Sequence, residues 1–346
     1  MQTKSFFFIA AIASLMLAAS CNELEKQNAS AGSLTVKVTD GILTKVASGT
    51  TAETYETQLN SVQILLFDSN GNLYRYANPS SMSDGGTQSF ENVNAGSYTV
   101  VAVANAPDLS SVSSLSALEA LSVELGDNST DAATGFRMYG YAPATVTDGN
   151  TTANPATCEI SLSRYTARVK LIRVTNSLPS ALGGLTVDNV MLINVLTSWN
   201  YAGSGDASTW GNLAGRNEGS VIASAAAATC ADLTFNGTGF SVAQGSPVSP
   251  DYKFYSFPNG STSDETGASA TEGPVRLVVT ATFDGRTYYY PVTIPGIARN
   301  TSYDVMLTIT GPGSDDPNTP VAKGNILATI VVSPWISGGE AYEETI

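Results

Sequence analysis

Histidine is absent from all 346 residues of this chain. Its imidazole is the commonest general base and transition-metal ligand in proteins, and serine and cysteine triads depend on it. The sequence also contains no Gly-x-Ser-x-Gly motif, phosphate-binding loop or dinucleotide fingerprint. We therefore expect a protein that is not an enzyme, with no catalytic residue, no cofactor and no bound metal.

Charged side chains are scarce, and most of them are acidic. They make up 13% of the residues, about half the ~25% of an average soluble protein, and the net charge is -14. Such a surface repels phosphate backbones and anionic headgroups, so we expect no nucleic-acid partner and no basic membrane-binding patch. Serine, threonine, asparagine and glycine are abundant instead, which is typical of extracellular β-structure.

Cysteine occurs only three times, at Cys21, Cys158 and Cys230. Two cysteines after position 21 are too few for a disulfide framework, although they could pair in an oxidising compartment. The sequence favours two buried free thiols over a disulfide and leaves both possible.

Long apolar runs are missing too, except at the N-terminus. Lys4 precedes an apolar-to-small run over residues 6–19, which is too short to span a bilayer and has the length of a signal peptide. The segment Leu-Ala-Ala-Ser-Cys (17–21), where this run ends, resembles a bacterial lipobox. We interpret residues 1–21 as a lipoprotein signal peptide and Cys21 as the lipidated first residue of an exported protein. The alternative is an ordinary secretory signal in which Cys21 is incidental.

The rest of the chain is typical of short strands. Apolar and polar residues alternate over residues 34–39, which indicates a half-buried strand, whereas residues 98–105 are apolar on both faces. An Asp284-Gly285 pair between the alternating runs 275–283 and 288–294 predicts a hairpin with a primed turn. Further strands are expected at 62–67, 158–175, 185–196, 253–257, 303–309 and 326–332.

One helix is expected, over residues 109–121, where leucine and valine recur every three residues between serines that can cap it. Residues 142–157 are polar and contain two prolines, so they form a linker or a long loop. We place the boundary between two β-sandwich domains there, with residues 22–155 in the first and 156–346 in the second.

Three segments could be interpreted as ligand sites, but a simpler structural interpretation fits each of them better. The loop that begins at Asp68 lacks the glycine and glutamate of a calcium loop, so we interpret it as a hairpin turn. Asp315 and Asp316 lie in a glycine- and proline-rich segment, which favours a solvated loop. Three consecutive tyrosines at 288–290 would place two rings in the core and one outside, rather than form a sugar platform.

Several segments together resemble the fimbrillin (type V pilin) family of lipoproteins. Besides the lipobox, they are QLNSVQILLFDSNGNL (58–73), NAGSYTVVAVANAP (94–107), SRYTARVKL (163–171), FYSFPN (254–259), IARNTSYDVMLTITGPGSDDP (297–317) and a last strand that ends in Pro334-Trp335. The resemblance implies an all-β protein of two tandem, transthyretin-like β-sandwich domains. It also implies export as a lipoprotein to the outer membrane and assembly into a cell-surface fimbrium that supports adhesion and biofilm formation.

The resemblance further implies an assembly mechanism. A trypsin-like protease removes the first strand, here residues 33–39, and the C-terminal strand of a neighbouring subunit fills the groove. The candidate donors are residues 326–332 and the tail 336–346. The family's arginine after the first strand is missing, and Lys45 stands in its place. We expect processing at Lys45 by a lysine-accepting protease; an unprocessed anchor subunit is the alternative. The expected partners are other copies of the chain, accessory pilus subunits, the protease and outer-membrane lipid.

Two other functions compete with a pilus subunit. A lipid-anchored glycan-binding module should display exposed aromatic pairs, and Trp199 and Trp210 lie in one irregular region. A hydrolase with a carboxylate pair has no motif to support it. A tip or anchor subunit that does not polymerise is a further variant of the first interpretation.

The lipobox leads to a direct prediction. A Cys21→Ala chain should remain unacylated and mislocalised, because acyl chains take the place of a transmembrane anchor. Metabolic labelling with a fatty acid and membrane fractionation measure this, and equal labelling of both chains would show that Cys21 is incidental.

Overall fold

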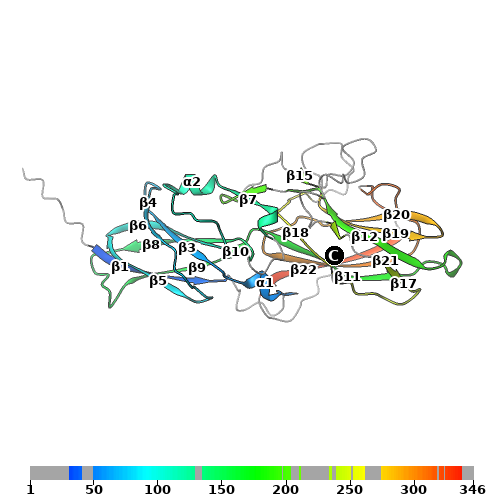
Figure 1. The fold of residues 1–346 in the computed structure, drawn as a ribbon, viewed down its shortest axis with the longest axis horizontal. Coiled ribbons are helices and arrows are strands. Elements are labelled where there is room, and N and C mark those ends of the chain that lie inside the picture. The colour runs from blue at the N-terminus through cyan, green and yellow to red at the C-terminus, as the bar shows by residue number, and fades with distance from the viewer. Residues whose placement is uncertain are drawn as a thin grey trace, which may run out of the picture.

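The chain folds into two β-sandwiches that lie end to end along the long axis of the molecule (Figure 1). The computed structural model describes residues 31–40, 50–128, 135–196, 198–203, 210–211, 234–235, 239–250, 252–261, 274–317, 319–322 and 324–336. Within these ranges the structure is nearly all strand, with two short α-helices. The all-β fold expected from the sequence is confirmed.

The first sandwich consists of a three-stranded sheet, β5-β1-β9, packed on a five-stranded sheet, β10-β8-β6-β3-β4. Alternate residues of β3 point to opposite faces, and all six are buried. One face packs against β1 and its neighbours, and the other faces the helical lid. The strands are β1 (Ala31–Thr39), β3 (Val62–Phe67), β4 (Leu73–Ala77), β5 (Thr87–Asn94), β6 (Gly96–Ala104), β8 (Met138–Val146), β9 (Ala156–Ser161) and β10 (Ser163–Arg164).

The lid over the outer face is shorter than the sequence suggested. Only α2 (Leu115–Glu119) is α-helical, and the Ser114 hydroxyl caps it by accepting the Ala117 N–H at 3.1 Å. Upstream, Asp108 accepts the Ser110 N–H at 2.9 Å and holds the chain in a turn. The expected helix over residues 109–121 is therefore wrong in length, because local side-chain bonds compete with the helix before Ser114.

The second sandwich pairs the sheet β18-β11-β21-β22-β2 with the sheet β16-β12-β19-β20, and β17 also pairs with β12. Its core is continuous with the lid side of the first sandwich. The strands are β2 (Thr50–Thr51), β11 (Ala167–Asn176), β12 (Leu185–Ile193), β16 (Thr234–Phe235), β17 (Phe240–Val242), β18 (Tyr252–Ser256), β19 (Arg276–Phe283), β20 (Arg286–Thr293), β21 (Thr301–Ile309) and β22 (Ile326–Ile336).

The hairpin β19–β20 agrees with its sequence signature. Asp284 and Gly285 both have positive φ, 48° and 70°, as a type I′ turn requires. On β20, Tyr288 and Tyr290 are buried, and the Tyr290 hydroxyl donates to the Gly311 carbonyl at 2.9 Å. These two rings belong to the core, as the alternation predicted.

The two sandwiches exchange segments at their junction. Strands β9 and β10 follow the expected boundary at residue 155 but pair with β1 and β8 of the first sandwich. In the other direction, β2 pairs with β22 of the second sandwich. A small sheet of β7 (Ser122–Glu124) and β14 (Ser198–Asn200) links the two halves again. The crossover in the chain therefore falls between β10 and β11.

A buried carboxylate lies at the centre of this junction. Glu56, in α1 (Thr54–Thr57), is fully buried and accepts Arg168 Nη1 at 2.7 Å and Trp335 Nε1 at 3.0 Å on Oε2. Its Oε1 accepts the Tyr255 hydroxyl at 2.8 Å. Arg168 is also fully buried and donates through Nε to Ser302 at 3.2 Å. We call Glu56, Arg168, Tyr255 and Trp335 the junction cluster.

A second arginine holds the backbone around the junction cluster. Arg164 donates Nε to the Glu56 carbonyl at 2.7 Å and Nη1 to both Asn300 Oδ1 and the Trp335 carbonyl. Burial lowers the pKa of Arg164 to about 10, which still leaves it protonated at neutral pH. Phe136 packs edge-on against Trp335 at 5.6 Å between ring centroids and completes an apolar wall. Helix α1, β10, β11, β18 and β22 thus meet at one site.

The junction cluster predicts that two ion pairs contribute very differently to the free energy of unfolding. Arg168→Met should lower the free energy of unfolding by about 3–5 kcal/mol, because it leaves the Glu56 carboxylate buried without its cation. The matched control is Lys37→Met. Lys37 Nζ lies 3.0 Å from Glu159 Oε1, and the two side chains are 47% and 59% exposed. Loss of this exposed ion pair should lower the free energy of unfolding by at most about 1 kcal/mol. Urea denaturation measures both, and similar losses would contradict the role of the cluster.

Candidate functional site: the slot of the first strand

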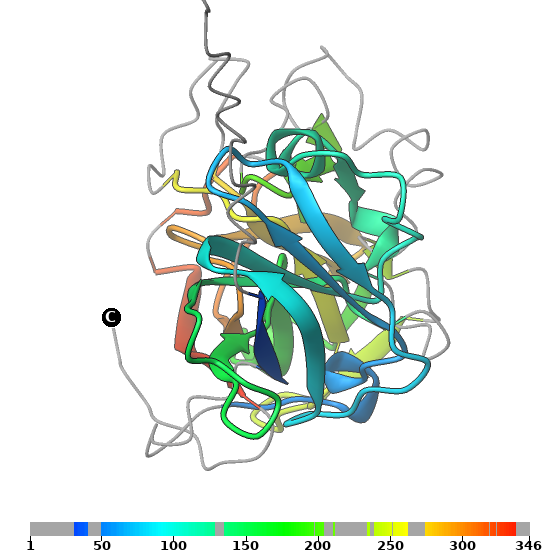
Figure 2. The same ribbon diagram turned by 90° about the vertical axis from the view of Figure 1, so that its left-hand side faces the viewer.

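Strand β1 is the middle strand of its sheet and not an edge strand. It pairs antiparallel with β5, from Ala31 opposite Asn94 to Lys37 opposite Thr87. On its other side it pairs parallel with β9, from Leu34 opposite Ala156 to Thr39 opposite Ser161. Figure 2 views this end of the molecule, with β1 in dark blue. Its backbone groups are therefore engaged on both sides by strands that come from later in the chain.

The inward face of β1 is apolar and fully enclosed. Leu34, Val36 and Val38 have no exposed surface and belong to one core cluster with the inner faces of β3, β6 and β8. Each such side chain stabilises the seated strand by roughly 1.5–3 kcal/mol relative to an exposed one. The outward face carries polar residues, among them Thr35, whose hydroxyl lies 3.2 Å from that of Ser89.

The strand begins at a close approach of backbone to backbone. A Cβ added at Gly32 would lie 2.6 Å from Val146 Cγ1 and 3.0 Å from the Thr147 carbonyl oxygen. The next residue, Ser33, donates its N–H to the Asn150 carbonyl at 3.0 Å. Only glycine fits at position 32, and it fixes the register of β1 against the loop that follows β8.

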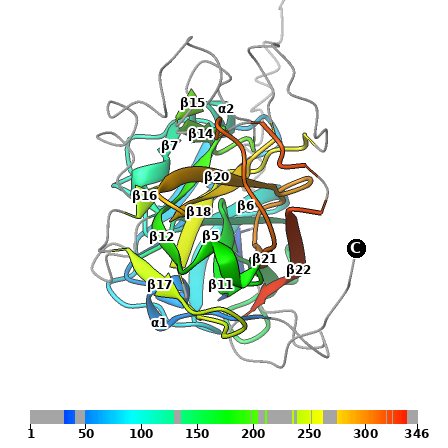
Figure 3. The ribbon, with the colours of Figure 1, turned by 90° about the vertical axis from the view of Figure 1, so that its right-hand side faces the viewer.

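In the second sandwich, β22 has one well-paired edge. It pairs antiparallel with β21 from Ile326 opposite Ile309 to Pro334 opposite Thr301. Within the described ranges, its second edge pairs only with β2, at Trp335 and Ile336. Figure 3 shows β22, in red, at the border of its sheet. Leu327 on this strand is 63% exposed.

Several residues singled out in the sequence lie outside the described residues. They include Cys21, Lys45, Cys230 and the tail after Ile336. Of the described cysteines, Cys158 on β9 is a buried free thiol, and burial raises its pKa.

The acidic loops have local roles. Asp68 accepts the N–H groups of Asn72 and Asn70 at 2.9 and 2.8 Å, and these bonds hold its pKa below the usual range. It closes the β3–β4 turn, as the sequence favoured. Asp315 lies 3.8 Å from Arg286 in an exposed pair. Within the described residues, no three His, Cys, Asp or Glu side chains are grouped so as to hold a metal ion.

The tryptophans have different environments. Trp335 is buried in the junction cluster, and Trp199 on β14 stacks on Phe257 at 5.7 Å between ring centroids. These two rings therefore pack within the protein. No helix in the described part of the chain is long and apolar enough to cross a bilayer.

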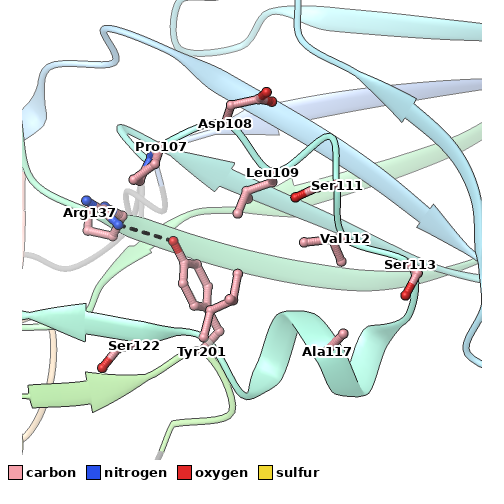
Figure 4. Close-up of a pocket in the computed structure, with 11 residues that line it drawn as sticks. Pro107, Asp108, Leu109, Ser111, Val112, Ser113, Ala117, Ser122, Arg137 and Tyr201 are labelled. Carbon is pink, nitrogen blue, oxygen red and sulfur yellow. Dashed lines mark hydrogen bonds between the residues drawn. The ribbon is translucent and has the colours of Figure 1, made fainter.

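A hollow of about 350 Å³ opens beside α2 (Figure 4). Its lining is mostly apolar and includes Leu109, Val112 and Ala117. Arg137 and Tyr201 point toward each other at one end, and Arg137 Nη1 donates to the Tyr201 hydroxyl at 3.3 Å. Sequence reasoning did not find this hollow, because Tyr201 enters it from the second half of the chain.

A family model described as fimbrillin-A associated anchor proteins Mfa1 and Mfa2 matches residues 21–218, more than half of the chain. The chain belongs to this fimbrillin family. The resemblance inferred from the sequence is thus confirmed, and a place on the cell surface as part of a fimbrium follows at family level.

Fimbrillin relatives show the same fold. The major fimbrium subunit FimA type-4 of Porphyromonas gingivalis is 33% identical over 75 residues, which span only 19% of that relative and 20% of this chain. A fimbrilin structure from P. gingivalis has a TM-score of 0.60 and 16% identity, and the alignment covers 91% of this chain and 100% of that one. The tip fimbrial protein Mfa3 of P. gingivalis has a TM-score of 0.50 and 15% identity, with 88% and 99% covered.

The enclosed face of β1 yields a test of what holds this strand in the fimbrillin fold. Leu34→Ala should lower the free energy of unfolding by about 2–5 kcal/mol, because it leaves a cavity in the slot. Thr35→Ala, on the outward face, should change it by no more than about 0.5 kcal/mol. Urea denaturation monitored by circular dichroism measures both. Equal losses would show that backbone pairing, and not the apolar face, fixes the strand.

Proposed function

We propose that this fimbrillin is a structural fimbrial subunit that is exported as a lipoprotein through Cys21, activated by proteolysis and polymerised by donor-strand exchange. Polymers of this kind would serve cell adhesion and biofilm formation at the outer membrane. The observation that supports the proposal most strongly is the position of β1. This N-terminal strand lies in an apolar slot between two strands from later in the chain.

Removal of β1 would create a strong template for strand addition. The facing edges of β5 and β9 would expose unpaired N–H and C=O groups, and the pockets of Leu34, Val36 and Val38 would be empty. Such an edge is completed readily by an extended segment of another chain. The backbone bonds are nearly conserved in the exchange, so better filling of the pockets has to provide the gain.

The positions of the lysines support cleavage at Lys45. No arginine occurs between Cys21 and Tyr74, and the lysines there are Lys26, Lys37 and Lys45. Lys26 precedes β1, so cleavage there would leave the strand in place. Lys37 lies within β1, whose backbone is paired on both sides. Cleavage after Lys45 is the one that would detach the whole strand.

The tail is the better candidate for the donor strand. Strand β22 already pairs with β21 along nine positions, and Trp335 is fixed in the junction cluster by its bond to Glu56. Moving β22 into a neighbour would disrupt both interactions. The tail after Ile336 takes part in neither of these two interactions, and the edge of β22 is the alternative point of contact.

These assignments predict how activation can be blocked. Lys45→Gln should prevent the conversion of monomer into oligomers by limited trypsin digestion, whereas Lys26→Gln should have no effect. Deletion of residues 337–346 should leave a subunit that is cleaved but does not assemble. Size-exclusion chromatography and electron microscopy of filaments report the outcome. If the intact protein yields no oligomers after digestion, and the tail deletion still forms filaments in cells, donor-strand exchange fails for this chain.

An anchor that is not processed is the second candidate, and the missing arginine favours it. Such a subunit would keep β1 seated and offer only its C-terminal end to a neighbour. N-terminal sequencing of protein from purified filaments separates the two candidates, because a processed subunit begins after Lys45 and an anchor begins at Cys21.

A further inference from the structure

A second hollow lies on the other side of α2, at the exposed face of β8. Its volume is about 340 Å³, within the range of ligand sites. It is formed by both halves of the chain, since Ala202 and Gly203 follow β14 while Thr99 lies on β6. The residues around it are Thr99, Leu115, Glu119, Tyr139, Tyr141, Tyr201, Ala202, Gly203 and Arg299.

Tyrosine rings dominate this hollow, and one of them has no role in the core. Tyr139 and Tyr141 lie two residues apart on β8 and so share a face, with 6.1 Å between their ring centroids. Tyr139 is buried against Tyr201 at 6.2 Å, whereas Tyr141 is 66% exposed. An exposed ring beside a buried one provides an apolar platform with a fixed back wall.

Two charged groups border the platform. Glu119, at the end of α2, is half-buried, and its carboxylate accepts no hydrogen bond and forms no ion pair in the described part of the chain. Arg299 is held in place, since Nε donates to the Arg164 carbonyl at 3.1 Å and Nη2 to the Ser163 carbonyl at 2.9 Å. Its guanidinium also lies 4.9 Å from the centroid of the Tyr165 ring. One acceptor and one oriented donor therefore border the tyrosines.

This combination fits a neutral sugar better than an ion. A pyranose ring has an apolar C–H face that can stack on Tyr141, and hydroxyl groups at its rim that both donate and accept. One carboxylate and one guanidinium at the same rim leave no net charge for an acidic or basic ligand, but they offer an acceptor and a donor to such hydroxyls. We propose that this hollow, bordered by Glu119, Tyr141 and Arg299, binds the terminal sugar of a neutral glycan.

The glycan site would add a ligand to the proposed adhesive function without depending on polymerisation. The hollow lies on the lid side of the first sandwich, and none of the residues around it belongs to β1 or β22. Binding can therefore be measured on unprocessed monomer, and strand exchange can fail while glycan binding holds, or the reverse.

The test uses purified full-length protein in a detergent without a sugar headgroup, screened on an array of neutral and sialylated glycans. We expect binding to one or more neutral glycans, confirmed by calorimetry with the free oligosaccharide. Tyr141→Ala should weaken the affinity by about tenfold, and Glu119→Gln should also weaken it. Tyr141→Phe keeps the ring and should bind like the parent, as should Leu327→Ala, which removes an exposed apolar side chain elsewhere.

Three results would overturn the proposal. The first is no binding to any neutral glycan on the array. The second is binding that neither Tyr141→Ala nor Glu119→Gln weakens. The third is self-association of the parent that Tyr141→Ala abolishes and that free neutral glycan does not compete with, which would assign the platform to contact between copies of the chain. Unchanged melting temperatures of the variants establish that a loss of binding is not a loss of folding.

Discussion

The buried ion pair between Glu56 and Arg168 is the interaction on which the arrangement of the two sandwiches depends. Both side chains are fully buried, so the carboxylate is stable only because arginine, tyrosine and tryptophan donors saturate it. These donors come from β11, β18 and β22, whereas Glu56 comes from a helix of four residues that has little stability of its own. The cluster therefore holds α1 in place and couples the N-terminal segment to the last strand.

The junction cluster lies after β1 and Lys45 in the sequence, so it separates the segment that the proposed cleavage would release from the fold that would remain. Glu56 follows both β1 and Lys45, so a cut at Lys45 would release β1 and keep every member of the cluster. Trp335, which is 1% exposed, likewise fixes the end of β22 in the cluster. In the proposed exchange, the remaining fold would act as a rigid body between the released first strand and the donor segment. Under the proposed processing, stability and assembly would be assigned to different segments, so that a subunit would be stable before and after the cut.

Sequence alone predicted the fold where the evidence was local, and missed contacts between distant residues. Alternation located β1, short apolar runs located β3 and β6, and the Asp284-Gly285 pair located a hairpin, because turn and strand signals lie within a few residues. The junction cluster joins Glu56 to Trp335, 279 positions apart, and a lone glutamate near a threonine-rich loop carries no sign of this partner. The tyrosine platform was missed for the same reason, since its walls come from both halves. The length of the lid helix was overestimated, because apolar residues at three-residue spacing also occur in a series of turns that side chains cap.

The two walls of the β1 slot run in opposite directions, because β1 is antiparallel to β5 and parallel to β9. A strand that enters the slot therefore meets one parallel and one antiparallel neighbour whichever way it points. Main-chain hydrogen bonding cannot choose between the two orientations. The choice is left to shape, above all to the close approach at Gly32, which admits no side chain at that end of the slot. The polarity of any fibre built through this slot would then depend on where the incoming strand carries a residue without a side chain.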